Sequence, residues 1–506
     1  MTPPSKSSAP RTLPDLLQGG DPAQPAIVVP GGPTLTYEQL ADRVENLAGR
    51  LHKAGVEPGA LVSMVLGNNI AFVETFLALT RVGAQAGPLN PAYTTDEFVS
   101  FIEDARASVA ILDPETGAAW EATRSLGVPS LGVTTGDAGV RLERDGVLVP
   151  ENGGVEQPDP GSTALFLHTS GTTSRPKGVP LTHANIVASA QNTVRTYDLG
   201  PEDASMTVMP LFHVHGLIGV VLSTLASGGR IVLPPRFSAS TFWPQAQGEG
   251  ATWYSGSPTI HQILLARADD DQAPRGAFRF IRSCSAALSP SVLEQVEARF
   301  EAPLVEAYGM TEGAHQIASN PLPPGERRAS SVGLQTGVEV AVMDERGVLL
   351  PATTNGEVVI RGPNVTHGYR DNPEANASSF SDGWFRTGDQ GFIADDGYVS
   401  LTGRIKEIIN RGGEKIAPLE VDAALMRHGA VAEAITFGVP DAKYGEDIHA
   451  AVVLRSEVSP DELQRFAAEH LAAFKVPKVI HLVDELPRTA TGKVQRRHVA
   501  AKFADA

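Results

Sequence analysis

Short apolar runs alternate with amphipathic stretches through the first 330 residues. Residues 60–68, ALVSMVLGN, form an apolar run that predicts a buried strand, and residues 69–84 continue with helical spacing. Four more runs have the texture of a strand ending in a turn, at 107–113, 251–258, 278–286 and 302–309. This alternation of strands and helices predicts an α/β fold, with parallel sheets covered by helices on both faces.

The pattern changes at about residue 330. Alternating runs broken by Gly and Asp, such as VEVAVMDERGVLL, GEVVIRG and GYVSLTGR, predict a small β-barrel or antiparallel sheet over about 330–403. Mixed strand and helix patterns then predict a small α+β domain over 404–506. We therefore expect a large N-terminal domain over 1–403, which includes the β-rich subdomain, and a C-terminal domain that begins near Gly403–Lys406.

Composition and charge narrow the classes of function. A chain of 506 residues is too long for one hydrophobic core, so two or more domains are expected. The net charge of −17 and the lack of a long Lys/Arg run argue against nucleic-acid binding. An anionic ligand must then be met by a local positive site. The single cysteine, Cys284, excludes a disulfide framework and a cysteine-built metal site. No apolar run has the length of a membrane span or signal peptide, so we expect a cytoplasmic protein.

Residues 168–178, HTSGTTSRPKG, form a hydroxyl-rich segment that follows an apolar run. Small residues let backbone N–H groups converge, hydroxyl groups add donors, and Lys177 adds a point charge, so the segment suits a polyphosphate. The Walker A spacing is absent. A hydroxyl run alone is more often an ordinary surface loop, so further motifs have to decide.

The spacing of Thr-Ser-Gly-Thr-Thr and Pro-Lys-Gly resembles the nucleotide-binding signature of the adenylate-forming acyl-CoA synthetase superfamily. Ser174 stands where most members have glycine. Companion motifs occur in the family's order and extend the resemblance over nearly the whole chain: EAYGMTE (306–312), WFRTGD (384–389), GRIKEIINRGGEKI (403–416) and PRTATGKVQRR (487–497).

The resemblance implies a nucleotide site assembled from these motifs. Thr311 would contact the α-phosphate, Glu312 would hold Mg²⁺, and Asp389 would accept hydrogen bonds from the ribose hydroxyls. Lys177 and Lys493 would offset negative charge, and Lys493 would be the catalytic lysine. The implied ATP-binding set is Thr169, Ser170, Gly171, Thr172, Thr173, Lys177, Glu306, Ala307, Tyr308, Thr311, Asp389, Arg404 and Lys493.

The resemblance also implies a reaction in two steps. A carboxylate attacks ATP to give an acyl-adenylate and pyrophosphate, and coenzyme A then displaces AMP. The substrates are ATP, CoA and a small carboxylate, with Mg²⁺ as cofactor and with no carrier protein. A mobile C-terminal domain would pivot at Lys406, and Arg411, Gly412 and Gly413 would line the CoA path.

Polar side chains stand where relatives that use fatty acids carry an apolar lining. His213 or His215, together with Ser285 and His315, would hydrogen-bond a second carboxylate. Segments such as PLFHVHGL and RFIRSCSAAL resemble the oxalate–CoA ligase branch, which implies oxalate as the acid. Malonate or a medium-chain acid remains an alternative, as does a carrier-loading adenylation module. A nucleotide-binding sensor without turnover is an alternative of another class.

Overall fold

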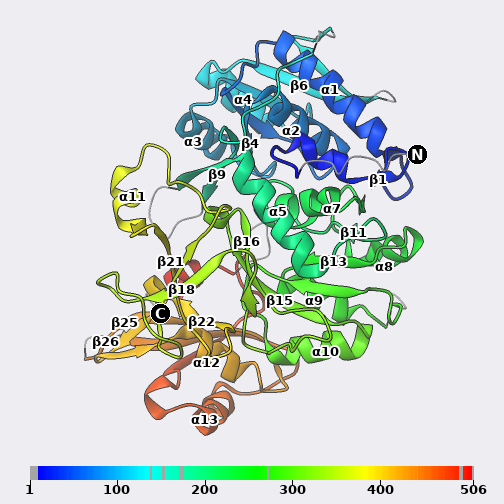
Figure 1. Ribbon diagram of the computed structural model, residues 1–506. Helices are drawn as coiled ribbons and strands as arrows, with labels where there is room; N and C mark the ends of the chain where they lie inside the picture. Colours follow the sequence, from blue (N-terminus) through cyan, green and yellow to red (C-terminus); the bar gives the residue numbers. More distant parts are fainter. Residues whose placement is uncertain are drawn as a thin grey trace.

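The computed structural model describes residues 9–136, 139–150, 154–169, 176–269, 273–441, 443–488 and 494–503. Figure 1 shows two large sheets stacked in the upper and middle parts of the molecule, with the C-terminal domain below them. Helices lie between and around the sheets, so the predicted α/β architecture is confirmed. Within the described residues no helix is long and apolar enough to cross a membrane.

The larger sheet has nine strands in the order β17-β16-β15-β14-β13-β11-β12-β1-β2. Its centre, from β15 to β1, is parallel, and β2, β16 and β17 are antiparallel additions at the edges. The strands span Leu334–Gln335 (β17), His315–Ser319 (β16), Leu304–Met310 (β15), Phe280–Ser283 (β14), Trp253–Gly256 (β13), Ala204–Met206 (β11), Arg230–Val232 (β12), Pro25–Val28 (β1) and Thr34–Thr36 (β2).

The second sheet has eight strands in the order β10-β9-β4-β3-β5-β6-β7-β8. It is parallel from β9 to β6, and hairpins add β10, β7 and β8. The strands span Lys177–Thr182 (β10), Thr163–Thr169 (β9), Gln85–Pro88 (β4), Leu61–Val65 (β3), Val109–Leu112 (β5), Ser130–Gly136 (β6), Gly139–Arg144 (β7) and Val147–Leu148 (β8).

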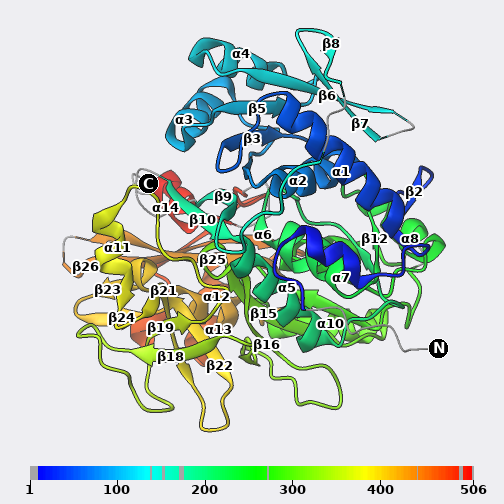
Figure 2. The ribbon, with the colours of Figure 1, turned by 45° about the horizontal axis from the view of Figure 1, so that its top comes forward.

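Helix α5 contacts strands of both sheets, and Figure 2 shows it running between them. Helix α2 is buried at every position, which is why its pattern is apolar throughout. The N-terminal helices span Pro14–Gly19 (η1), Tyr37–Lys53 (α1), Ile70–Val82 (α2), Thr95–Ala105 (α3), Gly117–Leu126 (α4), His183–Tyr197 (α5), Val214–Gly216 (α6), Leu217–Leu222 (η2, a π-helix), Ser223–Ala226 (α7), Ala239–Gly248 (α8), Pro258–Ala266 (α9), Pro290–Phe300 (α10), Thr311–Gly313 (η3) and Pro373–Ser379 (α11).

The β-rich segment is an antiparallel five-stranded sheet, as its alternating pattern predicts. It packs on the main core through Val358, Ile360 and Phe385. Its strands span Glu339–Met343 (β18), Gly356–Arg361 (β19), Phe380–Ser381 (β20), Trp384–Ile393 (β21) and Val399–Arg404 (β22).

The C-terminal part has its own hydrophobic core around Ile416, Val421 and Ile448. This agrees with a separate unit, and the boundary near Gly403 stays a prediction. Its elements span Ile405–Glu407 (η4), Ile409–Arg411 (β23), Glu414–Ile416 (β24), Pro418–Leu425 (α12), Val431–Asp441 (β25), Gly445–Leu454 (β26), Pro460–His470 (α13), Ala473–Lys475 (η5), Val479–Leu482 (β27) and Arg496–Phe503 (α14).

Candidate active site

Several predicted site residues follow the carboxyl ends of parallel strands in the two large sheets. Ser285 follows β14 and Thr311 follows β15, both at carboxyl ends, and β9 ends at Thr169 before the hydroxyl-rich segment. In open α/β sheets ligands bind outside the carboxyl ends of the strands. Ser170–Arg175, which include the predicted ATP ligands Ser170, Gly171, Thr172 and Thr173, lie outside the described residues.

Tyr369 joins two of the predicted phosphate-site residues. Its hydroxyl donates a 2.8 Å hydrogen bond to Oε1 of Glu312, and its ring lies under the Lys177 ammonium, with Nζ 4.3 Å from the ring centroid. Burial raises the pKa of Glu312, and the Tyr369 hydrogen bond and the Lys177 charge oppose that rise. Burial and the charge of Lys406 lower the pKa of Lys177. The four side chains therefore form one electrostatic unit.

Glu312 is suited to be a single carboxylate ligand for Mg²⁺. Within the described residues no group of three or more His, Cys, Asp or Glu side chains could hold a metal ion. Magnesium prefers one or two carboxylates and takes its other ligands from phosphate oxygens and water. One buried carboxylate beside a lysine fits such a shared site, in which Glu312 would hold the ion against the nucleotide phosphates.

Asp389 stands between Tyr308 and Arg404. The Tyr308 hydroxyl donates to Oδ2 of Asp389 at 2.5 Å, and Nε of Arg404 lies 2.7 Å from Oδ1. Each carboxylate oxygen accepts more than one hydrogen bond, so these contacts orient Asp389 and leave capacity for further donors. The ribose role predicted for Asp389 remains compatible with this arrangement.

Glu306 is a buried carboxyl group on β15. Its Oε1 accepts a 3.1 Å hydrogen bond from the backbone of Leu288, and its Oε2 has no hydrogen-bond partner within the described residues. Burial raises its pKa to about 8. At neutral pH the group is therefore mostly protonated, and it can donate as well as accept a hydrogen bond.

His215, Ser285 and His315 come together, although 100 residues separate the first from the last. Nδ1 of His215 lies 2.9 Å from Oγ of Ser285, and its Nε2 lies 2.6 Å from Oγ of Ser255. The His215 and His315 rings stack with centroids 5.2 Å apart. His213 caps helix α6 by accepting from the backbone N–H of His215 at 3.3 Å.

The surroundings of both stacked imidazoles favour the neutral form. Burial holds the pKa of His215 and of His315 well below the ordinary value, and the nearby Arg282 guanidinium lowers both further. Nε2 of His315 is buried without a hydrogen-bond partner in the part of the chain that the structure describes. Neutral imidazoles recognise an anion through N–H donors, so any charge must come from elsewhere.

Backbone strain marks the same cluster. Ser285 has φ 78° and His315 has φ 94°, a region that non-glycine residues seldom adopt. A Cβ on Gly219, in the π-helix η2, would lie 2.3 Å from the His315 imidazole, so only glycine admits that ring. Strained residues and π-bulges are frequent at functional sites.

Models of two known protein domains match this chain. A model of the family described as AMP-binding enzyme matches residues 18–370. The chain belongs to the AMP-binding enzyme family. A model described as AMP-binding enzyme C-terminal domain matches residues 420–493. The boundary predicted at Gly403–Lys406 falls between the two matches.

Individual relatives of this AMP-binding enzyme support the family assignment. An oxalate–CoA ligase of Arabidopsis thaliana is 47% identical over 497 residues, 96% of each chain. An oxalate–CoA ligase of Saccharomyces cerevisiae is 41% identical over 95% of this chain and 94% of that one. The crystal structure of ATP-bound MatB from Rhodopseudomonas palustris superposes with a TM-score of 0.89 at 29% identity, covering 98% and 99% of the two chains. The resemblance and the enzyme class, an AMP-forming CoA ligase, are confirmed.

The predicted CoA-path residues form a tight hairpin in this AMP-binding enzyme. Gly412 and Gly413 connect β23 to β24 with φ 62° and 97°, so the two-residue turn itself requires the glycine pair. Nε of Arg411 lies 2.6 Å from Oδ1 of Asp447, and its guanidinium covers the Tyr444 ring. These partners belong to the C-terminal part, and the CoA role stays a prediction.

Lys493 lies outside the described residues, but the residues on either side of its segment are described. Arg488 and Val494 form an antiparallel bridge. Nη1 of Arg488 donates a 2.6 Å hydrogen bond to Oγ1 of Thr259, at the start of α9 in the N-terminal part. The base of the segment that carries Lys493 is therefore held against the N-terminal part. The catalytic role of Lys493 and the hinge role of Lys406 remain predictions.

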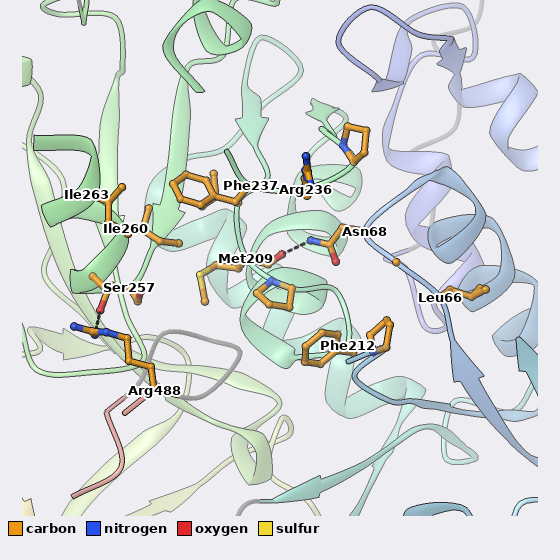
Figure 3. A pocket seen from close by; sticks show the side chains of 16 residues that line it. Leu66, Asn68, Met209, Phe212, Arg236, Phe237, Ser257, Ile260, Ile263 and Arg488 are labelled. Atoms are coloured by element: carbon orange, nitrogen blue, oxygen red, sulfur yellow. Dashed lines mark hydrogen bonds between the residues drawn. The ribbon is translucent and has the colours of Figure 1, made fainter. Parts of the chain in front are cut away.

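A cavity of about 460 Å³ lies beside this contact. Figure 3 shows the side chains that line it. Most of its lining is apolar, and two guanidinium groups, those of Arg236 and Arg488, border it. The lining residues include Leu66, Asn68, Met209, Phe212, Phe237, Ser257, Thr259, Ile260 and Ile263.

Sequence reasoning missed three positions that organise the site. Tyr369 lies outside the motifs quoted above, and nothing in its sequence neighbourhood singles out its hydroxyl. Ser255 and Gly219 contact the histidine pair from β13 and η2, and only tertiary structure brings them there.

Proposed function

We propose that this enzyme is an ATP-dependent oxalate–CoA ligase. The observation that carries the proposal is the cluster of the buried His215 and His315 with the partly exposed Ser285 at the carboxyl end of β14. Two relatives named as oxalate–CoA ligases cover nearly the whole chain, which supports the same acid.

The cluster favours a small diacid on energetic grounds. A second carboxylate would accept hydrogen bonds from the serine hydroxyl and from an imidazole N–H. A long alkyl chain would leave the Ser285 hydroxyl and the buried Nε2 of His315 without partners, at a cost of ~1–3 kcal/mol for a buried group. Such unpaired groups let a polar site reject an analogue by about 10⁴ in kcat/KM.

In the first step the reacting carboxylate of oxalate attacks the α-phosphate of ATP, and pyrophosphate leaves. Lys177 and Lys493 would offset the negative charge that builds up on the phosphates, and Thr311 would bind the α-phosphate. Mg²⁺, held by Glu312, supplies further charge neutralisation when bound. Tyr308, Ala307 and Glu306 would line the adenine pocket, while Asp389 and Arg404 would bind the ribose and phosphates.

In the second step the thiol of CoA attacks the oxalyl carbonyl and AMP leaves. The apolar cavity bordered by Arg236 and by Arg488, which forms an ion pair with Glu433, offers a path for this substrate, because a guanidinium group binds phosphates and apolar walls suit a pantetheine chain. In a protein of net charge −17 such local cations are needed to attract a polyanion. The Gly412–Gly413 hairpin would approach this path after a domain rotation about Lys406.

The test is pyrophosphate release measured with ATP and a panel of acids: oxalate, malonate, acetate and octanoate. Oxalate should give the highest kcat/KM, and acetate should be slower by several orders of magnitude. Ser285→Ala should reduce the oxalate-to-acetate ratio while the KM for ATP stays near wild type. If octanoate is the best substrate, or if Ser285→Ala leaves the ratio unchanged, the oxalate assignment is wrong.

A further inference from the structure

Arg282 is a fully buried guanidinium on β14, the strand that ends two residues before Ser285. It donates hydrogen bonds to three neutral oxygens, Tyr197 Oη (2.8 Å), Ser255 Oγ (3.0 Å) and Gln316 Oε1 (2.7 Å), and the Cys284 side chain also interacts with it. Within the described residues no carboxylate forms a salt bridge with it. Buried charges are normally paired, because an unpaired one is strongly destabilising. A positive charge without a counter-ion therefore lies next to the acid pocket.

An arginine can only donate hydrogen bonds, and this fixes the direction of the contacts that follow. Ser255 Oγ accepts from Arg282, so its own hydroxyl hydrogen has to go elsewhere. Ser255 is fully buried, and the remaining neighbour of its oxygen is Nε2 of His215 at 2.6 Å. Ser255 therefore donates to Nε2, and the proton of the neutral imidazole sits on Nδ1.

The same reasoning extends to Ser285. The N–H at Nδ1 of His215 donates to Ser285 Oγ across 2.9 Å. The hydroxyl hydrogen of Ser285 then has no acceptor among the described residues. Ser285 is partly exposed at the carboxyl end of β14, so this hydrogen is available to a ligand.

A second chain of hydrogen bonds starts at Arg282 and, unlike the one that ends at Ser285, leaves no hydroxyl hydrogen without an acceptor. Tyr197 accepts from Arg282 and donates to Ser319 at 2.8 Å, and Ser319 donates to the backbone carbonyl of Asn320 at 2.8 Å. Every hydrogen on this branch has an acceptor within the protein. A third branch goes to Gln316, whose Nε2 is buried without a hydrogen-bond partner among the described residues. The branch through Ser255 and His215 ends instead on a donor at the partly exposed Ser285.

We propose that Arg282 is a positioning residue for acid selection, which sets the His215 tautomer through Ser255 so that Ser285 donates to the second carboxylate of the acid. The proposal rests on the proposed oxalate function. The second carboxylate also supplies the negative charge that Arg282 lacks. A monoacid of similar size supplies neither the acceptor for Ser285 nor the negative charge for Arg282. Selectivity for a diacid therefore originates partly in Arg282, a side chain that does not touch the acid.

The main test compares Ser255→Ala with Tyr197→Phe. Each variant removes one hydroxyl that accepts from Arg282, but only Ser255 lies on the branch toward the pocket. Ser255→Ala should lower kcat/KM for oxalate roughly tenfold or more, which is the loss expected for one hydrogen bond to a charged group, with acetate activity and the KM for ATP little changed. Tyr197→Phe should keep the wild-type oxalate-to-acetate ratio.

A second variant separates positioning from folding. Arg282→Met removes an unpaired buried charge, so its Tm should equal or exceed that of wild type, while oxalate selectivity should fall as in Ser255→Ala. The ¹⁵N NMR shifts of His215, assigned by their loss in His215→Gln, should show the Nδ1–H tautomer in wild type.

The outcomes separate the positioning role of Arg282 from the proposed oxalate function. Oxalate use by the wild type with an unchanged acid ratio in Ser255→Ala would overturn the positioning role alone. An Nε2–H tautomer in wild type, or equal losses in Ser255→Ala and Tyr197→Phe, would overturn it as well. Failure of the wild type to use oxalate would instead overturn the proposed function.

Discussion

Tyr369→Phe removes one hydroxyl from the phosphate site and keeps the aromatic ring. The lost contact is the 2.8 Å hydrogen bond to Oε1 of Glu312, whereas the ring under the Lys177 ammonium remains. Because that hydrogen bond opposes the effect of burial on the pKa of Glu312, its loss raises the pKa further. The protonated form of Glu312 is then favoured, and a protonated carboxyl group is a poor Mg²⁺ ligand.

The size of the effect follows from the kind of contact. A hydrogen bond to a charged group contributes ~1.5–3 kcal/mol, and each ~1.4 kcal/mol is tenfold in an equilibrium constant. The Mg²⁺ concentration that gives half-maximal pyrophosphate release should therefore rise roughly tenfold or more. The defect should be largest at acidic pH and should shrink as the pH rises and Glu312 ionises.

The assay is pyrophosphate release at saturating ATP and acid, with Mg²⁺ varied at two pH values. Tyr369→Leu also removes the ring from Lys177, so it should add a further loss at saturating Mg²⁺. Tyr398→Phe is the matched control, because Tyr398 also donates a hydrogen bond, to the Glu326 carbonyl, and lies against a cation, Arg328. An unchanged Mg²⁺ requirement in Tyr369→Phe would show that Glu312 is not the magnesium ligand.

Three further predictions address other parts of the site. The pKa of Glu306 is about 8 in the folded protein against an ordinary value of 4.5. The free energy of unfolding of the wild type should therefore fall as the pH rises between these values, by at most ~1.4 kcal/mol per pH unit, and Glu306→Gln should remove this contribution. Urea-unfolding profiles against pH that run parallel for the two proteins would contradict this. Gly219→Ala places a Cβ 2.3 Å from the His315 ring and should abolish oxalate selectivity, measured against Gly200→Ala, whose Cβ meets nothing within 4 Å; equal acid ratios would refute the close fit. Lys406→Pro should retain adenylate formation and lose thioester formation, and wild-type rates in both half-reactions would place the hinge elsewhere.

Local patterns predicted most elements because local physics determines them. The helix expected over 69–84 forms as α2, since Asn69 caps it by accepting from the backbone of Phe72 and Gly83 ends it with φ 81°. The alternating β-rich segment forms the expected small antiparallel sheet. Motif spacing likewise indicated the nucleotide residues, several of which the fold brings into contact.

Contacts that depend on tertiary structure could not be predicted in the same way. Arg282 lies in a strand that is buried on both faces, and its partners come from three other elements, α5, β13 and β16. The sequence gives no sign that these elements converge or that the guanidinium lacks a carboxylate. The π-helix that admits His315 is similarly invisible, because its residues form an ordinary apolar run.

The most direct test of the account is a competition experiment with one enzyme sample, ATP, Mg²⁺ and CoA, and equal concentrations of oxalate, malonate, acetate and octanoate. Mass spectrometry of the thioesters reports the relative kcat/KM values in a single measurement. An oxalate–CoA ligase gives oxalyl-CoA as the dominant early product, with AMP formed in equal amount. Dominance of any other thioester, or AMP formation without a thioester, would contradict it.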